Sequence, residues 1–341
     1  MGHEHSGWAR WARRLALAAL VGAGLVSIVG SGGGIGASWP SICDTYPESC
    51  GPLPPTVTIE PALATVQVGS PMTFSARPEG FGDPTYRWQR SADGGRTFVD
   101  IPGATGASYR LAGANLGDDA TVFHVVVRPR GTSGPVAEAS SRLAVSSAPG
   151  IVFEDGDFPT GGWQVSEIAK PAANGAMHTE ERVASGGRPD AFRRMTHTMP
   201  ATQQSLGVMN LSNAAIYNPA VSGAIHVIDY SEDCALQNAG NPFFLVWSTV
   251  LIEQAGRRYR PRQLVSDACS SAAWTPVHEA TSLARADFEL LDGPACAAGQ
   301  LCPDFSASAP PIRLGFVRFA QASTTPTVHG IDNWKVTVWR K

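Results

Sequence analysis

An alternating apolar pattern around Trp88 constrains the fold of this 341-residue chain more than any other feature of its sequence. Tyr86 and Trp88 alternate with polar residues, and a period of two recurs in Met72–Ala76 and Phe123–Val127. Such alternation is typical of β-strands with one buried face. A count of 36 Gly and 26 Pro, with only 16% charged residues, fits short strands joined by many turns. The sequence therefore predicts an all-β protein.

Residues 56–147 carry a set of motifs that can be compared with known repeats. The set is Trp88-Gln-Arg-Ser-Ala-Asp-Gly-Gly, Ile101-Pro-Gly-Ala-Thr, Tyr109-Arg-Leu and Asp118-Asp-Ala-Thr-Val-Phe. It resembles the immunoglobulin-like repeats of bacterial surface and secreted proteins. The resemblance implies a two-sheet β-sandwich with a buried tryptophan, acting as a spacer or an interaction platform.

Four positions of this segment depart from the immunoglobulin pattern. Ala76 and Val125 stand where that fold places its two sheet-bridging cysteines around the tryptophan. Ala120 replaces a glycine that usually follows the acidic pair, and Phe123 replaces the corner tyrosine. We therefore expect this sandwich to be held together by packing, without a disulfide or a tyrosine corner.

Residues 150–341 form a second predicted domain, in which helical periodicity is confined to Thr281–Leu291. Its opening, Phe153–Phe158 with Trp163, and its ending, Gly330–Val338, resemble the first and last strands of jelly-roll modules, including carbohydrate-binding modules and lectin-like sandwiches. The predicted architecture is an immunoglobulin-like β-sandwich followed by a jelly-roll β-sandwich.

The jelly-roll resemblance also implies a metal site. Such modules often hold a structural calcium ion between the first and last strands, and the matching positions are Glu154, Asp157 and Asp332. Carboxylate oxygens are the ligands that calcium prefers. The alternative is that these residues are solvated turn residues.

Aromatic side chains could supply flat faces for sugar recognition. Alternation does not show which face of a strand is wet, so each candidate is alternatively a core residue. The candidates for ligand binding are Trp163, Tyr230, Tyr259, Trp274 and Trp334.

The N-terminal segment is typical of export. Three arginines precede the apolar run Leu15–Val29, and small residues follow it. The run is shorter than the roughly 20 residues that a membrane-spanning helix needs. We expect residues 1–37 to be a signal peptide, alternatively an uncleaved anchor, and residues 38–55 to be a proline-rich spacer. The protein would be periplasmic, cell-surface or secreted, with membrane contact only through this segment.

Six cysteines all follow the predicted signal peptide. An even number in an exported chain favours disulfides, and six cysteines allow 15 pairings. Sequence proximity favours Cys43 with Cys50 and Cys296 with Cys302, which leaves Cys234 with Cys269.

Catalytic templates are largely missing from the sequence. His278-Glu279 lacks the second histidine of a zinc protease, and no Gly-x-Ser-x-Gly or phosphate loop is present. The net charge of −3 argues against a nucleic-acid partner. We expect a non-catalytic binding or adhesion protein of the cell envelope that recognises glycan or a surface protein. The alternatives are a glycan-active hydrolase or lyase with two facing carboxylates, and an architectural protein without a soluble ligand.

Overall fold

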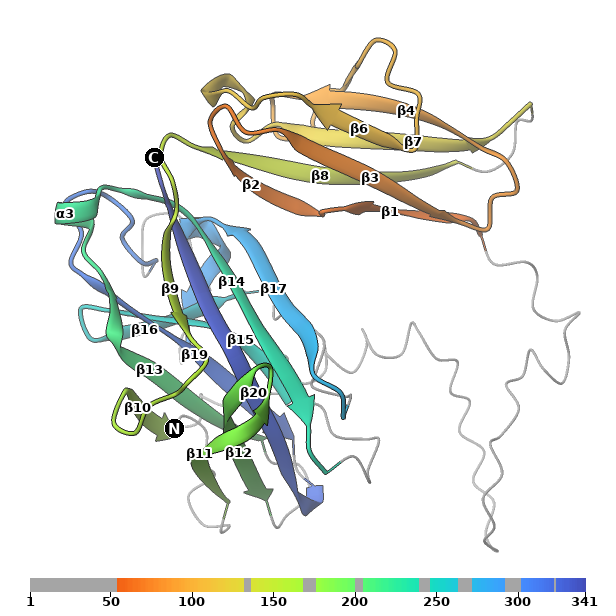
Figure 1. Cartoon of the computed structure of the whole chain (residues 1–341). Coiled ribbons are helices and arrows are strands. Elements are labelled where there is room, and N and C mark those ends of the chain that lie inside the picture. Colours follow the sequence, from red (N-terminus) through yellow and green to blue (C-terminus); the bar gives the residue numbers. More distant parts are fainter. Residues whose placement is uncertain are drawn as a thin grey trace, which may run out of the picture. The chain divides into compact units, whose positions relative to one another are not determined.

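The chain is all-β in the computed structural model, where four sheets form two sandwiches (Figure 1). The structure describes residues 54–131, 136–167, 176–199, 205–238, 246–262, 272–291, 302–321 and 323–341, all within one compact unit, Pro54–Lys341. The predicted signal peptide and most of the predicted spacer lie outside these residues. Within the described ranges, no helix has the length and apolarity needed to cross a bilayer. The all-β prediction is confirmed.

The first sandwich contains, in chain order, β1 (Thr56–Glu60), β2 (Leu63–Gln67), β3 (Met72–Glu79), β4 (Pro84–Ser91), β5 (Val99–Asp100), β6 (Ser108–Leu111), the 3-10 turn η2 (Leu116–Asp118), β7 (Val122–Pro129) and β8 (Ala137–Ser146). One sheet has the order β1-β3-β6 and the other β2-β8-β7-β4-β5. All pairs are antiparallel except β2 with β8. This sheet order is that of an immunoglobulin-like sandwich.

Trp88 lies in the core of this sandwich, as predicted. Its side chain is fully buried, and its Nε1 donates a hydrogen bond to the carbonyl oxygen of Gly106 at 2.9 Å. Ala76 on β3 and Val125 on β7 are buried in the same cluster, from opposite sheets. Packing therefore occupies the two positions that a disulfide would bridge.

The other two departures also have structural consequences. Phe123 is fully buried and stacks on Phe74 across the core, with ring centroids 4.6 Å apart. It fills the place of the corner tyrosine without that residue's hydroxyl. Ala120 is exposed and adopts φ +61°, a left-handed conformation that glycine adopts more easily. The alanine therefore introduces local backbone strain.

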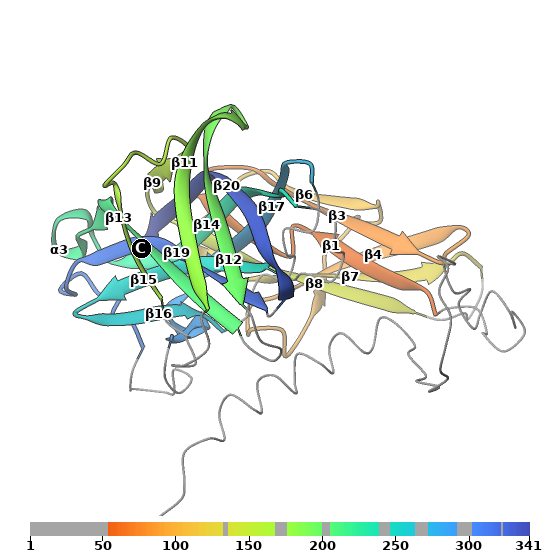
Figure 2. The same cartoon turned by 90° about the horizontal axis from the view of Figure 1, so that it is seen from below.

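The second sandwich contains β9 (Ile151–Asp155), β10 (Trp163–Glu167), β11 (Met177–Gly187), β12 (Asp190–Met199), β13 (Ser205–Tyr217), α3 (Pro219–Ser222), β14 (Ile225–Leu236), β15 (Val246–Gln254), β16 (Arg257–Pro261), β17 (Thr275–Leu283), η3 (Arg285–Asp287), β18 (Phe288–Leu290), β19 (Ile312–Gln321) and β20 (Ser323–Arg340). One sheet has the order β10-β13-β19-β15-β16-β18, and the other β11-β12-β20-β14-β17 (Figure 2). β9 pairs antiparallel with β20, so the first and last strands of this sandwich are neighbours.

One correction applies to the expected local structure. The helical pattern at Thr281–Leu291 was wrong: the segment ends β17, forms η3 and continues as β18. Ser282 has φ +55°, and its N–H is bonded to Asp229 Oδ1 at 2.6 Å. This left-handed residue interrupts any helix at that point.

Strand β19 shows how the second core is built. Ile312, Leu314 and Phe316 face the space between the two sheets, and all are fully buried. Val317 and Phe319 lie on the opposite face, in a second buried cluster that includes Trp247. This sheet is therefore apolar on both faces, which blurs the alternation in its sequence.

Polar contacts join the two sandwiches along β2 and β17. Thr65 Oγ1 and Ser282 Oγ lie 2.6 Å apart, and Thr281 Oγ1 donates to the carbonyl of Leu63 at 3.0 Å. Thr65 Oγ1 also donates to Asp229 Oδ1 at 3.1 Å. The residues between Ser146 and Ile151 are therefore not the only connection between the sandwiches.

Candidate functional site

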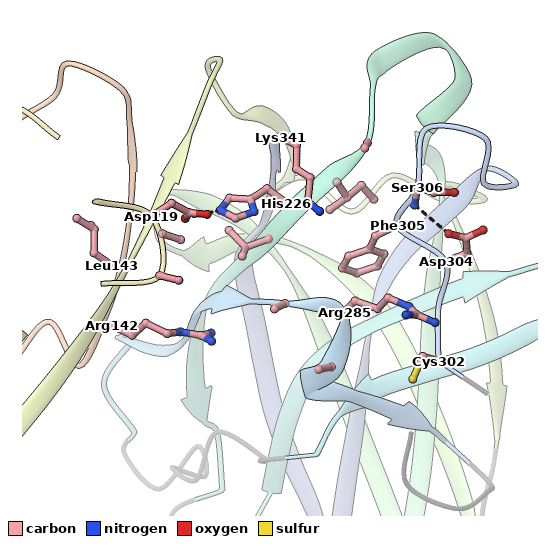
Figure 3. Close-up of a pocket in the computed structure, with 17 residues that line it drawn as sticks. Asp119, Arg142, Leu143, His226, Arg285, Cys302, Asp304, Phe305, Ser306 and Lys341 are labelled. Atoms are coloured by element: carbon pink, nitrogen blue, oxygen red, sulfur yellow. Dashed lines mark hydrogen bonds and ion pairs between the residues drawn. The ribbon is translucent and has the colours of Figure 1, made fainter. Parts of the chain in front are cut away.

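A cleft of about 1030 Å³ lies where the two sandwiches meet (Figure 3). The first sandwich contributes residues next to η2 and in β8, and the second contributes the start of β14, η3 and part of the segment before β19. Ligand pockets commonly occur at domain interfaces and have volumes of roughly 300–1,000 Å³. The cleft is therefore the candidate binding site of the described structure.

A histidine–aspartate pair crosses this cleft. His226 Nε2 lies 2.8 Å from Asp119 Oδ1, and the same oxygen accepts the N–H of Val145 at 2.9 Å. Figure 3 shows the pair spanning the two sandwiches. The Asp119 carboxylate is thus fixed in position by these two contacts within the protein.

Two arginines line the cleft, one from each sandwich. Arg142 Nη2 donates to the carbonyl of Ser282 at 3.1 Å and lies 3.7 Å from Asp287 Oδ2. Arg285 is exposed, and its Nε donates to the carbonyl of Pro303 at 2.8 Å. Each guanidinium is anchored through some of its nitrogens, which leaves other donors to face a ligand.

The segment beside Arg285 is fixed on β15. The buried Gln254 side chain donates to the carbonyl of Asp304 at 2.8 Å and accepts the N–H of Asp304 at 2.7 Å. Asp304 Oδ1 in turn accepts the N–H of Ser306 at 2.9 Å. Both carboxylates that line the cleft, Asp119 and Asp304, accept internal hydrogen bonds.

Most of the aromatic candidates for sugar stacking are core residues. Their side chains are between 1% and 7% exposed, and all belong to the cluster between the two sheets: Trp163, Tyr230, Tyr259 and Trp334. Trp163 and Trp334 meet edge to face, with centroids 4.9 Å apart. For these four, core packing is the structural role, because a buried ring offers no face to a surface ligand.

Trp274 is the partly exposed member of the five. Its Nε1 donates to the carbonyl of Gly186 at 2.7 Å, and its ring meets Phe192 edge to face at 5.2 Å. The ring also lies close over Gly330, where a β-carbon would come within 2.6 Å of it. Trp274 therefore depends on a glycine in β20 for its position, and it lies outside the cleft.

The predicted calcium ligands are only partly brought together. Asp332 is fully buried, and its oxygens accept the N–H groups of Arg188 and Asn333. Burial raises the pKa of Asp332, and nearby Asp233 and Asp157 add to that increase while the two backbone hydrogen bonds oppose it. Asp332 thus has Asp157 as an acidic neighbour.

Glu154 lies apart from this pair in the sheet register. It is exposed on β9 and pairs with Lys335. Among the described side chains, no group of three or more His, Cys, Asp or Glu residues is arranged to hold a metal ion. Calcium remains a proposal for which Asp157 and Asp332 are the relevant residues.

The described cysteines are Cys234 and Cys302, and both are disulfide-bonded. The other four, Cys43, Cys50, Cys269 and Cys296, lie outside the described residues. The predicted pairing therefore stays a prediction.

An ion pair is enclosed in the core of the second sandwich. Arg318 Nη2 lies 2.7 Å from Glu232 Oε1, and both side chains are fully buried. Tyr230 donates its hydroxyl to the other oxygen of Glu232 and lies 3.5 Å from Ser248 Oγ. Burial raises the pKa of Tyr230 well above its usual value, and the Glu232 charge adds to this. Tyr230 is therefore a neutral donor.

Two histidines lie near this ion pair. His197 on β12 and His329 on β20 are fully buried, and their rings stack with centroids 5.0 Å apart. Their ring nitrogens have no hydrogen-bond partner within the described part of the chain. Burial lowers the pKa of His197 to about 3, with further lowering by His178 and Arg318, and burial lowers the pKa of His329 well below its usual value. Both imidazoles are therefore neutral.

Neither the cleft nor this polar core was predicted from the sequence. Arg318 occupies an inward position of β19, in phase with Leu314 and Phe316, so an arginine within the apolar period was a usable signal. The cleft has no comparable signal, because Arg142 and Arg285 come from separate sandwiches.

Comparisons with known proteins give limited similarity. No family model matches the chain. Endoglucanase C of Cellulomonas fimi is 36% identical over 118 residues, which cover 35% of this chain and 10% of that protein. Two Dscam1 structures of four N-terminal Ig domains, isoforms 6.9 and 8.4, are 24% and 26% identical, with TM-scores of 0.23 and 0.22, over 27% of this chain and 21% of each of theirs. The sheet order, and not these scores, defines the first sandwich as immunoglobulin-like.

Proposed function

We propose that this chain is an exported, non-catalytic protein that binds a glycan in the cleft between its two sandwiches. The observation that carries the proposal is the cleft, whose volume is about 1030 Å³ and whose wall combines anchored polar side chains from both sandwiches. Ligand sites place a few fixed polar groups in a concavity in this way. The local identity with Endoglucanase C supports a carbohydrate ligand.

The two sandwiches have different parts in this proposal. The second is a jelly-roll of the carbohydrate-binding type, with calcium near Asp157 and Asp332. The first is a spacer at the cell envelope that also completes the cleft through Asp119 and Arg142. Polar contacts such as Thr65 with Ser282 hold the cleft walls together.

Binding is favoured over hydrolysis or elimination by the state of the carboxylates. A glycosidase needs one carboxyl group to give a proton and a second to attack or activate water. Asp119 accepts from Val145 and pairs with His226, while Asp304 accepts from Ser306. Both carboxylates are therefore already engaged in hydrogen bonds within the protein.

The test is a screen of the purified protein against neutral and acidic polysaccharides, followed by calorimetry on the best ligand. Ala286 is exposed in η3 and lines the cleft, so Ala286→Trp would fill the site whatever the charge of the ligand. The matched control is Ala107→Trp, at an exposed alanine outside the cleft. We expect the first variant to abolish binding and the second to leave it unchanged.

Three results would overturn the proposal. The first is no binding to any polysaccharide, with or without calcium. The second is full binding by Ala286→Trp. The third is release of new reducing ends or unsaturated sugars by the protein, since that would make it an enzyme.

A further inference from the structure

The chemistry of the cleft narrows the class of its ligand. Arg142 and Arg285 come from different sandwiches and line the same hollow (Figure 3). Arg142 extends from β8 toward the second sandwich, while Arg285 runs along the segment that contains Asp304. A ligand that fills the cleft therefore meets two separate guanidinium groups.

Each guanidinium is held in place by a backbone carbonyl. Arg285 gives its Nε to the carbonyl of Pro303 at 2.8 Å, and none of its terminal nitrogens has a partner among the described residues. Arg142 gives one Nη to the carbonyl of Ser282 at 3.1 Å, and its side chain is 37% exposed. Such anchoring reduces the entropy lost when the remaining donors bind an anion, because the fork is already oriented.

The carboxylates that line the cleft form no ion pair with Arg285 among the described residues, whereas Arg142 Nη2 lies 3.7 Å from Asp287 Oδ2. Asp119 is taken up by His226 and the N–H of Val145. Asp304 accepts the N–H of Ser306, and no ion pair joins it to Arg285 within the described residues. The fork of Arg285 is thus available to an anionic group of a ligand, and planar guanidinium groups bind carboxylate, sulfate or phosphate oxygens in pairs.

We propose that the cleft recognises a polysaccharide carrying anionic groups, with Arg285 and Arg142 as the specificity-determining residues. This inference rests on the proposed glycan-binding function and narrows it to one ligand class. It also makes the site composite, because the two arginines belong to different sandwiches.

The experiment compares two forms of one polymer, polygalacturonate and its fully methyl-esterified form, which share a backbone and differ in charge. Binding to the intact protein is measured by calorimetry at two salt concentrations. Arg285→Gln removes the charge and keeps a polar chain of similar length. Arg257→Gln is the matched control, because Arg257 is exposed on β16 and does not line the cleft. Thermal unfolding of each variant checks that it is folded.

We expect the intact protein to bind the acidic form about tenfold or more tightly than the esterified form, as loss of a charge-assisted hydrogen bond implies. Arg285→Gln removes that difference, and Arg257→Gln retains it. Competition with dextran sulfate and with a polyphosphate separates a general anion site from one that prefers carboxylate. Equal binding of the acidic and the esterified polymer overturns the proposal of an anionic ligand, and so does an equal loss of affinity in Arg285→Gln and Arg257→Gln. The proposed glycan-binding function stands in either case. Failure to bind any polysaccharide refutes the proposed function itself.

Discussion

Acid should destabilise the second sandwich through its buried histidine pair. His197 has an ordinary pKa of 6.5 in the unfolded chain and about 3 in the fold, where its ring is fully buried. The unfolded state therefore binds a proton that the folded state excludes, and stability falls as the pH drops below about 6.5. The loss continues until the pH approaches 3, and above 6.5 this residue makes stability independent of pH.

The size of the effect follows from the two pKa values. At pH 4.5 the unfolded His197 lies two pH units below its pKa, while the folded residue is still neutral. One unit corresponds to 1.36 kcal/mol, so His197 alone lowers the free energy of unfolding by about 3 kcal/mol between pH 7 and pH 4.5. His329 adds a loss in the same direction, because burial also lowers its pKa.

The charged surroundings of the pair strengthen this expectation. Arg318 on β19 and His178 on β11 both disfavour a positive charge on His197, while Glu167 on β10 favours it less strongly. Glu180 has the opposite effect on stability. Burial raises the pKa of its carboxyl group, so protonation in acid removes the cost of burying the charge. The pH dependence of the stability of the intact protein is therefore the sum of the histidine and Glu180 contributions. A variant without the two histidines is needed to measure their contribution alone.

The assay is native-state hydrogen exchange of the β12 and β20 amides at pH 7 and pH 4.5, corrected for intrinsic exchange rates. The perturbation is the double variant His197→Asn, His329→Asn, and the measured quantity is the difference in opening free energy between the two pH values. Baseline changes caused by the substitutions cancel in that difference. We expect the parent to lose about 3 kcal/mol or more relative to the double variant.

The control variant is His124→Asn, in the first sandwich. We expect its β12 and β20 amides to lose as much opening free energy on acidification as those of the parent. If the double variant loses as much stability on acidification as the parent, the reasoning about buried neutral imidazoles is wrong.

Three further predictions concern packing, backbone strain and metal. Trp88→Ala should destabilise the first sandwich by about 3–5 kcal/mol, and Trp88→Phe by clearly less, in urea unfolding; an equal effect of both would contradict the core role. Ala120→Gly should stabilise the same sandwich by about 1 kcal/mol or less, because it relieves a φ of +61°; a destabilised variant would refute the strain argument. If calcium binds near Asp157 and Asp332, chelation should lower the melting temperature of the second sandwich and Asp332→Asn should reduce that shift; an unchanged melting temperature excludes the ion.

The sequence predicted the first sandwich well because strands such as β3 alternate between buried and more exposed residues. Trp88 and Phe123 are both inward, at the positions that the period of two assigned to them. Their motifs also resembled a known repeat, which implied a two-sheet sandwich around a buried tryptophan.

The second sandwich was harder to predict for a physical reason. The sheet that contains β15 and β19 is buried on both faces, so Trp247 and Phe319 on one face look in sequence like Phe316 on the other. Alternation then shows that a strand exists but not which side is exposed. Tyr230 and Trp334 were considered as sugar platforms for that reason, and only the packed structure assigns them to the core.

His329 of the buried histidine pair and the cleft lie toward opposite ends of the paired strands β14 and β20, which separates their effects. In the pairing of β14 with β20, Leu236 stands opposite His329, while Ile225 stands opposite Arg340 beside the cleft. Eleven residues of strand between these positions correspond to roughly 35 Å. Protonation of His329 therefore cannot act on a ligand in the cleft by direct contact. If ligand binding is lost in acid at the pH where β12 and β20 open, that loss comes from unfolding of the second sandwich.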